Sequence, residues 1–297
     1  MYATDLIRNP DGSIYHLSLF PEDIADKIIL VGDQGRVDRV ARYFDRIELT
    51  RQHREFRTVT GWKDQQRLTV LSTGIGTDNI DIVWHELDAL INYDWEADTY
   101  RPTLRSLKAL RLGTCGGLQA EIPLGTLVHS RYAIGGDALM GYYRPQRRPP
   151  AGAQALTQSL RALTAKLLPD PPRWYGAQCD EALDALLTAN YAAILPGLTY
   201  TAAGFYGPQG RSLGRVSLAM PDLLAVLRSF SFDGLRVLNL EMECAAIMAL
   251  GHALGHRAGT LAVILAQREQ GRFHPEPHRA VDDLVRTGLQ VMLGWEG

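Results

Sequence analysis

Lys27-Ile-Ile-Leu-Val-Gly-Asp-Gln-Gly-Arg36 joins a short β-branched run to a glycine-containing turn and then to a stretch of helical period. The consecutive apolar residues at 28–31 predict a strand that is buried on both faces. The pattern at 35–44 predicts a helix that covers it. A buried strand that passes through a tight turn into a helix is the unit from which α/β folds are built.

Apolar runs of this kind alternate with helical stretches along the whole chain. We expect strands at 27–31, 68–72, 109–112, 126–133, 198–202, 237–240 and 261–266, and we place His53 to Phe56 in a further strand. We expect helices at 35–44, 78–90, 155–168, 179–190, 242–254 and 279–293. The alternation predicts an α/β fold, a three-layer α/β/α sandwich with a mixed central sheet. Two segments, 92–105 and 144–150, break the alternation and are expected to be surface excursions.

The composition is that of an ordinary globular protein, and it limits the classes of partner. We expect one domain over residues 1–297. A net charge of -2 leaves no basic excess to neutralise a polyanion, so we expect no nucleic-acid and no membrane partner. Three widely spaced cysteines, Cys115, Cys179 and Cys244, predict free thiols. The N-terminus lacks a secretory pattern and no apolar run approaches ~20 residues, so we expect a cytoplasmic location.

Polar residues follow several of the expected strands, where α/β folds bind their ligands. Gly32 to Arg36 lets backbone N–H groups approach an anion at a helix N-terminus, although a tight turn with a solvated Arg36 would give the same pattern. Ser72-Thr-Gly-Ile-Gly-Thr77 offers a second close backbone approach. It has neither the glycine spacing of a dinucleotide fold nor the lysine of a P-loop, which excludes both readings.

Arg111, Glu241 and Glu243 are the charged residues at the ends of two apolar strands. A buried guanidinium is costly unless it meets an anion or a carboxylate, so Arg111 predicts either an anion site or an ion pair with one of these glutamates. The two carboxylates can accept hydrogen bonds from vicinal hydroxyls. They can equally cap the helix that begins there.

Ala203-Gly-Phe-Tyr-Gly-Pro-Gln-Gly-Arg211 places a ring, an amide and a guanidinium in one short segment. The Gln209 amide and the Arg211 guanidinium can donate and accept along one edge of a planar imide, while Phe205 covers its face. This combination of side chains favours a pyrimidine ligand.

Taken together, these motifs resemble those of the nucleoside phosphorylase family, over most of the chain and in the family's order. The matching stretches are 15–17, 32–36, 53–56, 72–76, 111–114, 205–211 and 241–243. The resemblance implies that phosphate is bound by Gly32, Arg36, Arg111 and Thr114, with Arg54 reaching the neighbouring subunit's site. It implies that His16 also crosses the interface of a homodimer, which can build a hexamer, to touch the ribose.

The resemblance assigns the other site residues as well. Glu243 and Met242 would hold the ribose hydroxyls with support from Glu241, and the base would meet Phe205, Gln209, Arg211 and Arg268. Arg111, Gln209, Arg211 and Glu243 are then the residues expected to carry catalysis. The reaction implied is phosphorolysis of a pyrimidine nucleoside such as uridine, giving the free base and ribose 1-phosphate. Inorganic phosphate is a co-substrate, and no organic cofactor and no metal is expected.

One position helps to choose the base. Purine-specific members place an Asp after the strand that here ends in Gln267-Arg268, and this chain has no acid before Glu269. That difference favours a pyrimidine. The alternatives are a purine nucleoside phosphorylase, a hydrolytic nucleosidase of the same fold, and a nucleoside-binding protein without catalysis. Scattered histidines such as His274 and His278, separated by prolines, do not form a metal motif.

Overall fold

A computed structural model describes residues 4–168 and 170–296 of the chain. Its strands form one large mixed sheet in the order β11-β12-β10-β8-β13-β7-β1-β4-β3-β2, with β9 and β14 attached to β8 and β13. The strands are β1 (Lys27–Val31), β2 (Arg46–His53), β3 (Phe56–Lys63), β4 (Gln66–Ser72), β7 (Lys108–Gly117), β8 (Leu127–Gly135), β9 (Tyr175–Gln178), β10 (Leu195–Thr201), β11 (Ser231–Phe232), β12 (Leu235–Glu241), β13 (Arg257–Gln267) and β14 (Arg272–Phe273). A separate hairpin joins β5 (Tyr93–Asp94) to β6 (Thr99–Tyr100).

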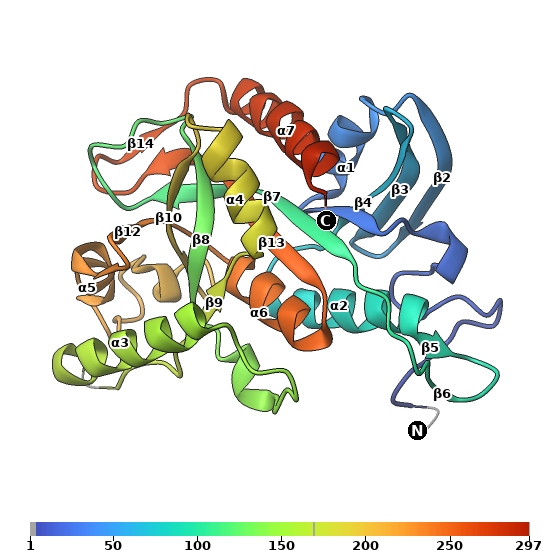
Figure 1. Cartoon of the computed structure of the whole chain (residues 1–297). Helices are drawn as coiled ribbons and strands as arrows, with labels where there is room; N and C mark the ends of the chain where they lie inside the picture. The colour runs from blue at the N-terminus through green and yellow to red at the C-terminus, as the bar shows by residue number, and fades with distance from the viewer. Residues whose placement is uncertain (1–3, 169, 297) are drawn as a thin grey trace.

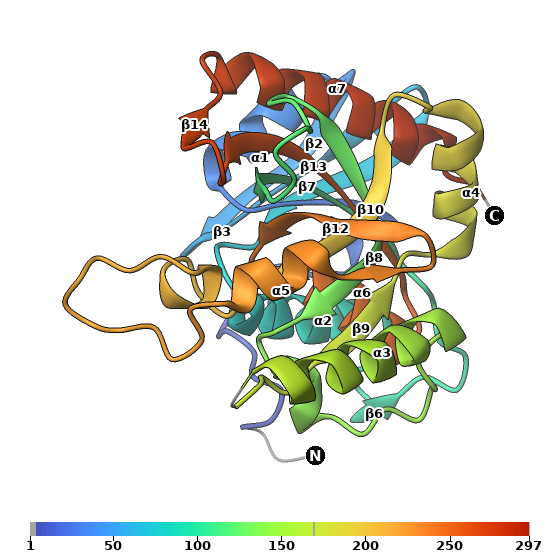
Figure 2. The same ribbon diagram turned by 90° about the vertical axis from the view of Figure 1, so that its left-hand side faces the viewer.

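Helices cover both faces of this sheet, as the two views in Figures 1 and 2 show. The helices α1 (Gln34–Ala41), α4 (Glu181–Asn190) and α7 (Pro277–Gly294) lie on one side, and α2 (Thr77–Asn92), α3 (Ala151–Leu167) and α6 (Cys244–Leu254) lie on the other. The short helix α5 (Leu223–Ser229) packs against β12 at the edge. Short 3-10 turns occur at Pro21–Asp23, Leu139–Tyr142 and Gly207–Gln209. The predicted three-layer sandwich with a mixed sheet is confirmed.

One part of the sheet is curled so far that two strands distant in the strand order, β12 and β7, also pair with each other. β12 is a neighbour of β10 but also pairs with the end of β7, where Asn239 and Leu240 face Gly117 and Gly116. The parallel pairs β1–β4, β1–β7, β7–β13, β8–β10 and β10–β12 align the carboxyl ends of these strands. Closure therefore brings the residues that follow β10 and β12 next to those of β7. The sequence did not indicate this closure.

The expected elements are found with shifts at their ends, and several other elements were not foreseen. The missed elements are helix α5 and the strands β2, β3, β5, β6, β9, β11 and β14. The expectation of a strand through 53–56 is wrong: β2 ends at His53, Arg54 takes a left-handed φ of 53°, and β3 begins at Phe56. The residues between are a hairpin turn, since β2 and β3 are antiparallel neighbours.

The two expected excursions lie on the surface. Residues 96–106 are exposed, and the base of this loop is held by buried Asn92, which accepts from the N–H of Arg105 at 2.7 Å and donates to its carbonyl oxygen at 3.1 Å. The segment 144–150 is partly exposed and leads directly into α3. Cys115, Cys179 and Cys244 are free and buried, as predicted. Among the residues that the structure describes, none of the helices combines the length and apolar character needed to cross a membrane.

Candidate active site

The turn from Gly32 to Arg36 connects β1 to α1. Asp33 caps the helix, its Oδ1 accepting from the N–H of Arg36 at 2.8 Å. The Arg36 side chain is only 13% exposed; it donates to the carbonyl oxygen of Leu112 at 3.2 Å and pairs with Asp33 at 3.0 Å. Burial lowers the pKa of Arg36. The alternative of a solvated Arg36 is therefore wrong, because the guanidinium lies across the strand β7 that also carries Arg111.

Arg111 is buried in β7 and forms ion pairs with both glutamates. Its Nη2 lies 3.2 Å from Glu241 Oε2 and donates directly to Glu243 Oε2. Burial alone would lower the pKa of Arg111, but the two carboxylates outweigh it and raise that pKa above its ordinary value. The ion-pair alternative is thus correct for this chain. It does not use the whole guanidinium, since Arg111 Nη1 is buried without a hydrogen-bond partner among residues 4–168 and 170–296.

The two glutamates have different surroundings. Glu241 accepts from the Thr201 hydroxyl at 2.6 Å and from the N–H groups of Glu243 and Cys244 at 2.8 and 2.9 Å, so it caps the start of α6. This explains why α6 begins at Cys244 and not at Met242. Glu243 instead accepts from the N–H of Gly76 at 2.8 Å. Burial raises the pKa of Glu241, and Arg111 opposes that shift.

The neighbouring backbone turns approach each other closely. A Cβ built on Gly32 would lie 3.8 Å from the carbonyl oxygen of Gly74, so the first and second turns meet at their glycines. Thr114 is half-buried in β7 and faces Val263 of β13 in register. Met242 is half-buried in the bend between β12 and α6. Of the two turns, the second contacts the Arg111–Glu243 ion pair directly, through the Gly76 N–H that donates to Glu243.

The segment after β10 forms a second cluster. Gln209 is buried, and its Oε1 accepts from Arg211 Nη1 at 2.5 Å. Arg211 lies over the Phe205 ring at 3.7 Å, and Arg268 donates to the Gln209 carbonyl oxygen at 3.1 Å. Desolvation and the charge of Arg268 lower the pKa of Arg211 to about 10. One nitrogen of Arg268, Nη1, is buried and has no hydrogen-bond partner within the described part of the chain. The amide, the ring and the guanidinium are therefore brought together as expected.

His16 and Arg54 lie apart from both clusters. His16 Nδ1 is 2.6 Å from Glu86 Oε1, and the same carboxylate accepts from the N–H of Leu17 at 2.8 Å. Arg54 is exposed on the β2–β3 turn, with Nη2 3.4 Å from the Tyr15 hydroxyl. Neither side chain contacts Arg111 or the glutamates in its own chain, within the ranges described.

Three residues of the site were missed from the sequence. The Gly76 amide and the Thr201 hydroxyl hold Glu243 and Glu241, and Glu86 holds His16. Gly76 stands in a turn whose glycines already indicated a close backbone approach. Thr201 and Glu86 gave no signal, because each lies inside an ordinary strand or helix pattern and becomes a partner only through the tertiary fold. In the described ranges no cluster of three or more His, Cys, Asp or Glu side chains is arranged to hold a metal ion.

Comparison with known proteins found a matching family model and several similar proteins. Residues 26–292 match the family model described as the phosphorylase superfamily. A guanosine phosphorylase of Halorubrum lacusprofundi is 37% identical over 279 residues, covering 92% of this chain and 93% of that protein. A uridine phosphorylase of Thermococcus kodakarensis is 26% identical over 295 residues, covering 97% of this chain and 90% of that protein.

Solved structures agree with these matches. A nucleoside phosphorylase of Trypanosoma brucei, described as showing uridine phosphorylase activity, superposes with a TM-score of 0.86 at 32% identity and covers 97% of this chain and 99% of its own. A purine nucleoside phosphorylase of Toxoplasma gondii has a TM-score of 0.66 at 18% identity, covering 97% of each chain, and so shares the fold. By name, the two sequence relatives differ in the nucleoside, which is guanosine for one and uridine for the other.

Proposed function

The chain belongs to the phosphorylase superfamily as a pentosyltransferase of the nucleoside phosphorylase type, and from this membership we propose that it cleaves pyrimidine nucleosides, uridine above all, with inorganic phosphate. The observation that carries the proposal is the buried Gln209 amide held against Arg211 over the Phe205 ring. An amide and a guanidinium side by side match the O4, N3–H and O2 groups of uracil.

The reaction breaks the bond between C1′ of the ribose and N1 of uracil and forms a bond between C1′ and a phosphate oxygen. Positive charge builds on the sugar as the first bond lengthens. A phosphate held by Arg36 and Arg111 on the opposite face stabilises that charge and is placed to attack. The electron pair of the broken bond stays on uracil, and Arg211 and Gln209 stabilise the resulting anion before N1 takes a proton from water.

We assign the anion role to Arg111 because of its unused donor. Nη1 is buried and unpartnered in the described ranges, so a phosphate oxygen that binds there removes the cost of an unsatisfied group. Glu243 lies on the other side of the same guanidinium and can accept from the ribose hydroxyls. Phosphate and ribose would thus be bound by two ends of one ion pair. Arg54 and His16 of a second subunit complete the proposed site in a homodimer, and the site as proposed uses no organic cofactor.

A second candidate, phosphorolysis of 6-oxopurine nucleosides, is favoured by the 37% identity to a guanosine phosphorylase. The O6 and N1–H edge of guanine presents the same acceptor and donor as the O4 and N3–H edge of uracil. Arg268 argues for the pyrimidine, since the position after Gln267 has no carboxyl to serve the purine N7.

The test measures release of the free base from uridine, cytidine, guanosine and adenosine, each with and without phosphate. We expect phosphate-dependent release that is fastest from uridine. Faster release from guanosine would favour the purine candidate, release without phosphate would indicate a nucleosidase, and tight binding without turnover would indicate a binding protein.

A further inference from the structure

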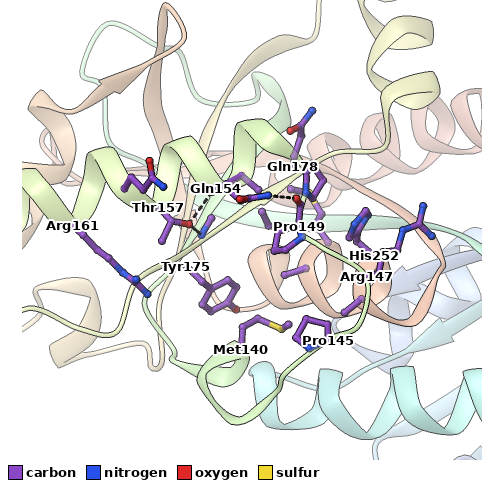
Figure 3. A pocket seen from close by; sticks show the side chains of 18 residues that line it. Met140, Pro145, Arg147, Pro149, Gln154, Thr157, Arg161, Tyr175, Gln178 and His252 are labelled. Carbon is purple, nitrogen blue, oxygen red and sulfur yellow. Dashed lines mark hydrogen bonds between the residues drawn. The ribbon is translucent and has the colours of Figure 1, made fainter.

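A cavity of about 320 Å³ is separate from the candidate active site, since none of its lining residues belongs to that site. It is enclosed by the start of α3, by β9, by one face of α6 and by the segment 144–150 (Figure 3). Its volume is within the range of small-molecule sites, which begins at roughly 300 Å³. We propose that this cavity binds a small monocarboxylate with an aromatic or branched apolar body.

The roof of the cavity is a fixed part of the fold. The segment 144–150, called the strap below, contains three prolines, which restrict its backbone. Gln154 of α3 donates to the Pro149 carbonyl oxygen at 2.6 Å, and His252 of α6 is hydrogen-bonded through Nε2 to the Arg148 carbonyl oxygen at 2.9 Å. The strap is thus tied to both helices. A cavity that is already formed spares the ligand the entropic cost of ordering it.

The body of the proposed ligand follows from the apolar lining. Tyr175 and Met140 lie between the two ends of the cavity in Figure 3, and Met248, Ala249 and Ala153 supply the helical walls. The Tyr175 ring is held in place, because its hydroxyl donates to both carboxylate oxygens of Asp137 at 2.9 and 2.8 Å. Walls of this composition gain free energy by covering an apolar body, roughly 25 cal/mol for each Å² buried.

The charge of the ligand follows from the rim. Two guanidiniums line the cavity, Arg147 at one end and Arg161 at the other, and no carboxylate lines it. Arg161 donates to the Trp174 carbonyl oxygen at 2.8 Å. Arg147, in contrast, makes no hydrogen bond and no ion pair with any residue the structure describes. Asp180 and Glu181 line an adjoining hollow that Arg147 also borders, but Asp180 is paired with Arg257, and Asp137 is held by the Tyr175 hydroxyl. A carboxylate entering the cavity would therefore meet an unpaired cation, with no carboxylate of the chain in the same lining.

The test titrates the full-length protein with 4-phenylbutanoate and with 4-phenylbutanamide, its uncharged counterpart, by calorimetry. We expect the carboxylate to bind and the amide to bind about tenfold more weakly, a factor equivalent to about 1.4 kcal/mol. Arg147→Ala should remove this preference. Arg148→Ala is the matched control, since it deletes the same charge from the same strap at a position that does not line the cavity, and it should leave both affinities unchanged.

A second variant tests the cavity independently of charge. Ala249→Trp fills the space from the α6 wall and should abolish binding of both compounds while the protein stays folded by circular dichroism. The proposal is overturned if millimolar phenylbutanoate does not bind, if Arg148→Ala weakens binding as much as Arg147→Ala, or if Ala249→Trp leaves affinity unchanged. It is also overturned if Ala249→Trp changes the sedimentation of the protein, because the cavity is then a contact between copies of the chain. Each readout is binding or assembly, so the result does not depend on the proposed reaction.

Discussion

Gly113 fixes where the Arg111 guanidinium can lie. A Cβ built on Gly113 would be 1.9 Å from Arg111 Nη1 and 2.6 Å from its Cζ, so the guanidinium occupies the space a side chain at 113 would need. The glycine is therefore required for the close approach and not for an unusual backbone angle. Its neighbour in the same strand, Gly116, has only ordinary contacts at 3.4 Å or more.

We predict that Gly113→Ala raises the KM for phosphate at least about tenfold, because a displaced Arg111 loses the donor proposed to hold the anion, an effect of ~1.4 kcal/mol or more. The measurement is initial velocity against phosphate concentration at saturating uridine. Gly116→Ala serves as the control and should keep the wild-type KM for phosphate. Equal effects of the two substitutions would show that the strand, and not the position of Arg111, is responsible.

In the proposed site, Arg211 serves the base and not the anion. It lies over Phe205 and is hydrogen-bonded to Gln209, both in the segment after β10, whereas Arg36 belongs to α1 and Arg111 to β7. We predict that Arg211→Ala lowers kcat/KM for uridine by about 10²-fold, the usual effect of removing one donor to a developing anion, with little change in the KM for phosphate. Steady-state kinetics with each substrate varied in turn gives both values.

The exposed Arg215, on the same loop, supplies the comparison: Arg215→Ala should retain near wild-type kinetics. A parallel loss of phosphate binding in Arg211→Ala would contradict the division of the site into an anion end and a base end.

At the scale of elements, helix α4 depends on one carboxylate. Asp180 Oδ1 accepts from the N–H groups of Ala182 and Leu183, both at 3.1 Å, and the carboxylate receives two hydrogen bonds from Arg257 at 2.8 Å. Burial alone would raise the pKa of Asp180, but these bonds outweigh it and lower the pKa below the ordinary 3.8. A carboxylate whose folded pKa is depressed stabilises the fold above its unfolded pKa, and this contribution is lost as the pH falls through the folded value.

We therefore predict that Asp180→Ala lowers the free energy of unfolding by about 1–3 kcal/mol at neutral pH, through loss of the cap and of the Arg257 pair. The difference from wild type should shrink as the pH is lowered below about 4. Urea unfolding across this pH range measures it. Glu181→Ala, one residue further along and exposed, should have little effect at any pH. A difference that stays constant with pH would exclude the ionised carboxylate as the cause.

The same elements show what a sequence can predict and where it stops. β1 was predicted over its full length because its apolar residues are buried on both faces, a pattern that is unambiguous. β2 was missed because it is exposed along nearly its whole length and has no alternation. The start of α6 was placed too early since Glu241, which holds its first N–H groups, belongs to β12. The individual site motifs were found, but the pairing of Arg111 with both glutamates needs the tertiary fold.

At the scale of the whole molecule, closure of the sheet brings the strand ends of the candidate site together. Two of the expected site residues, His16 and Arg54, lie outside this cluster. β12 meets both β10 and β7, so the ends of three strands that are distant in sequence become neighbours. The β2–β3 turn lies beside the first glycine turn, where Gln34 donates to the Arg54 carbonyl oxygen at 2.7 Å. The Arg54 side chain nevertheless contacts Tyr15, in the N-terminal segment of its own chain. In the proposed homodimer, the second subunit would supply the Arg54 side chain of the site.

This arrangement can be tested by mixing two inactive variants. If each active site of a twofold dimer takes Arg111 from one chain and Arg54 from the other, a dimer of Arg54→Ala with Arg111→Ala holds one site with both changes and one site with neither. Random pairing of equal amounts then restores about a quarter of the wild-type phosphorolysis. If Arg54 serves its own chain, every site in every dimer carries one change, and the mixture stays as inactive as its components. The mixture must be dissociated and reassembled before the assay, and wild type carried through the same steps shows how much activity reassembly itself recovers.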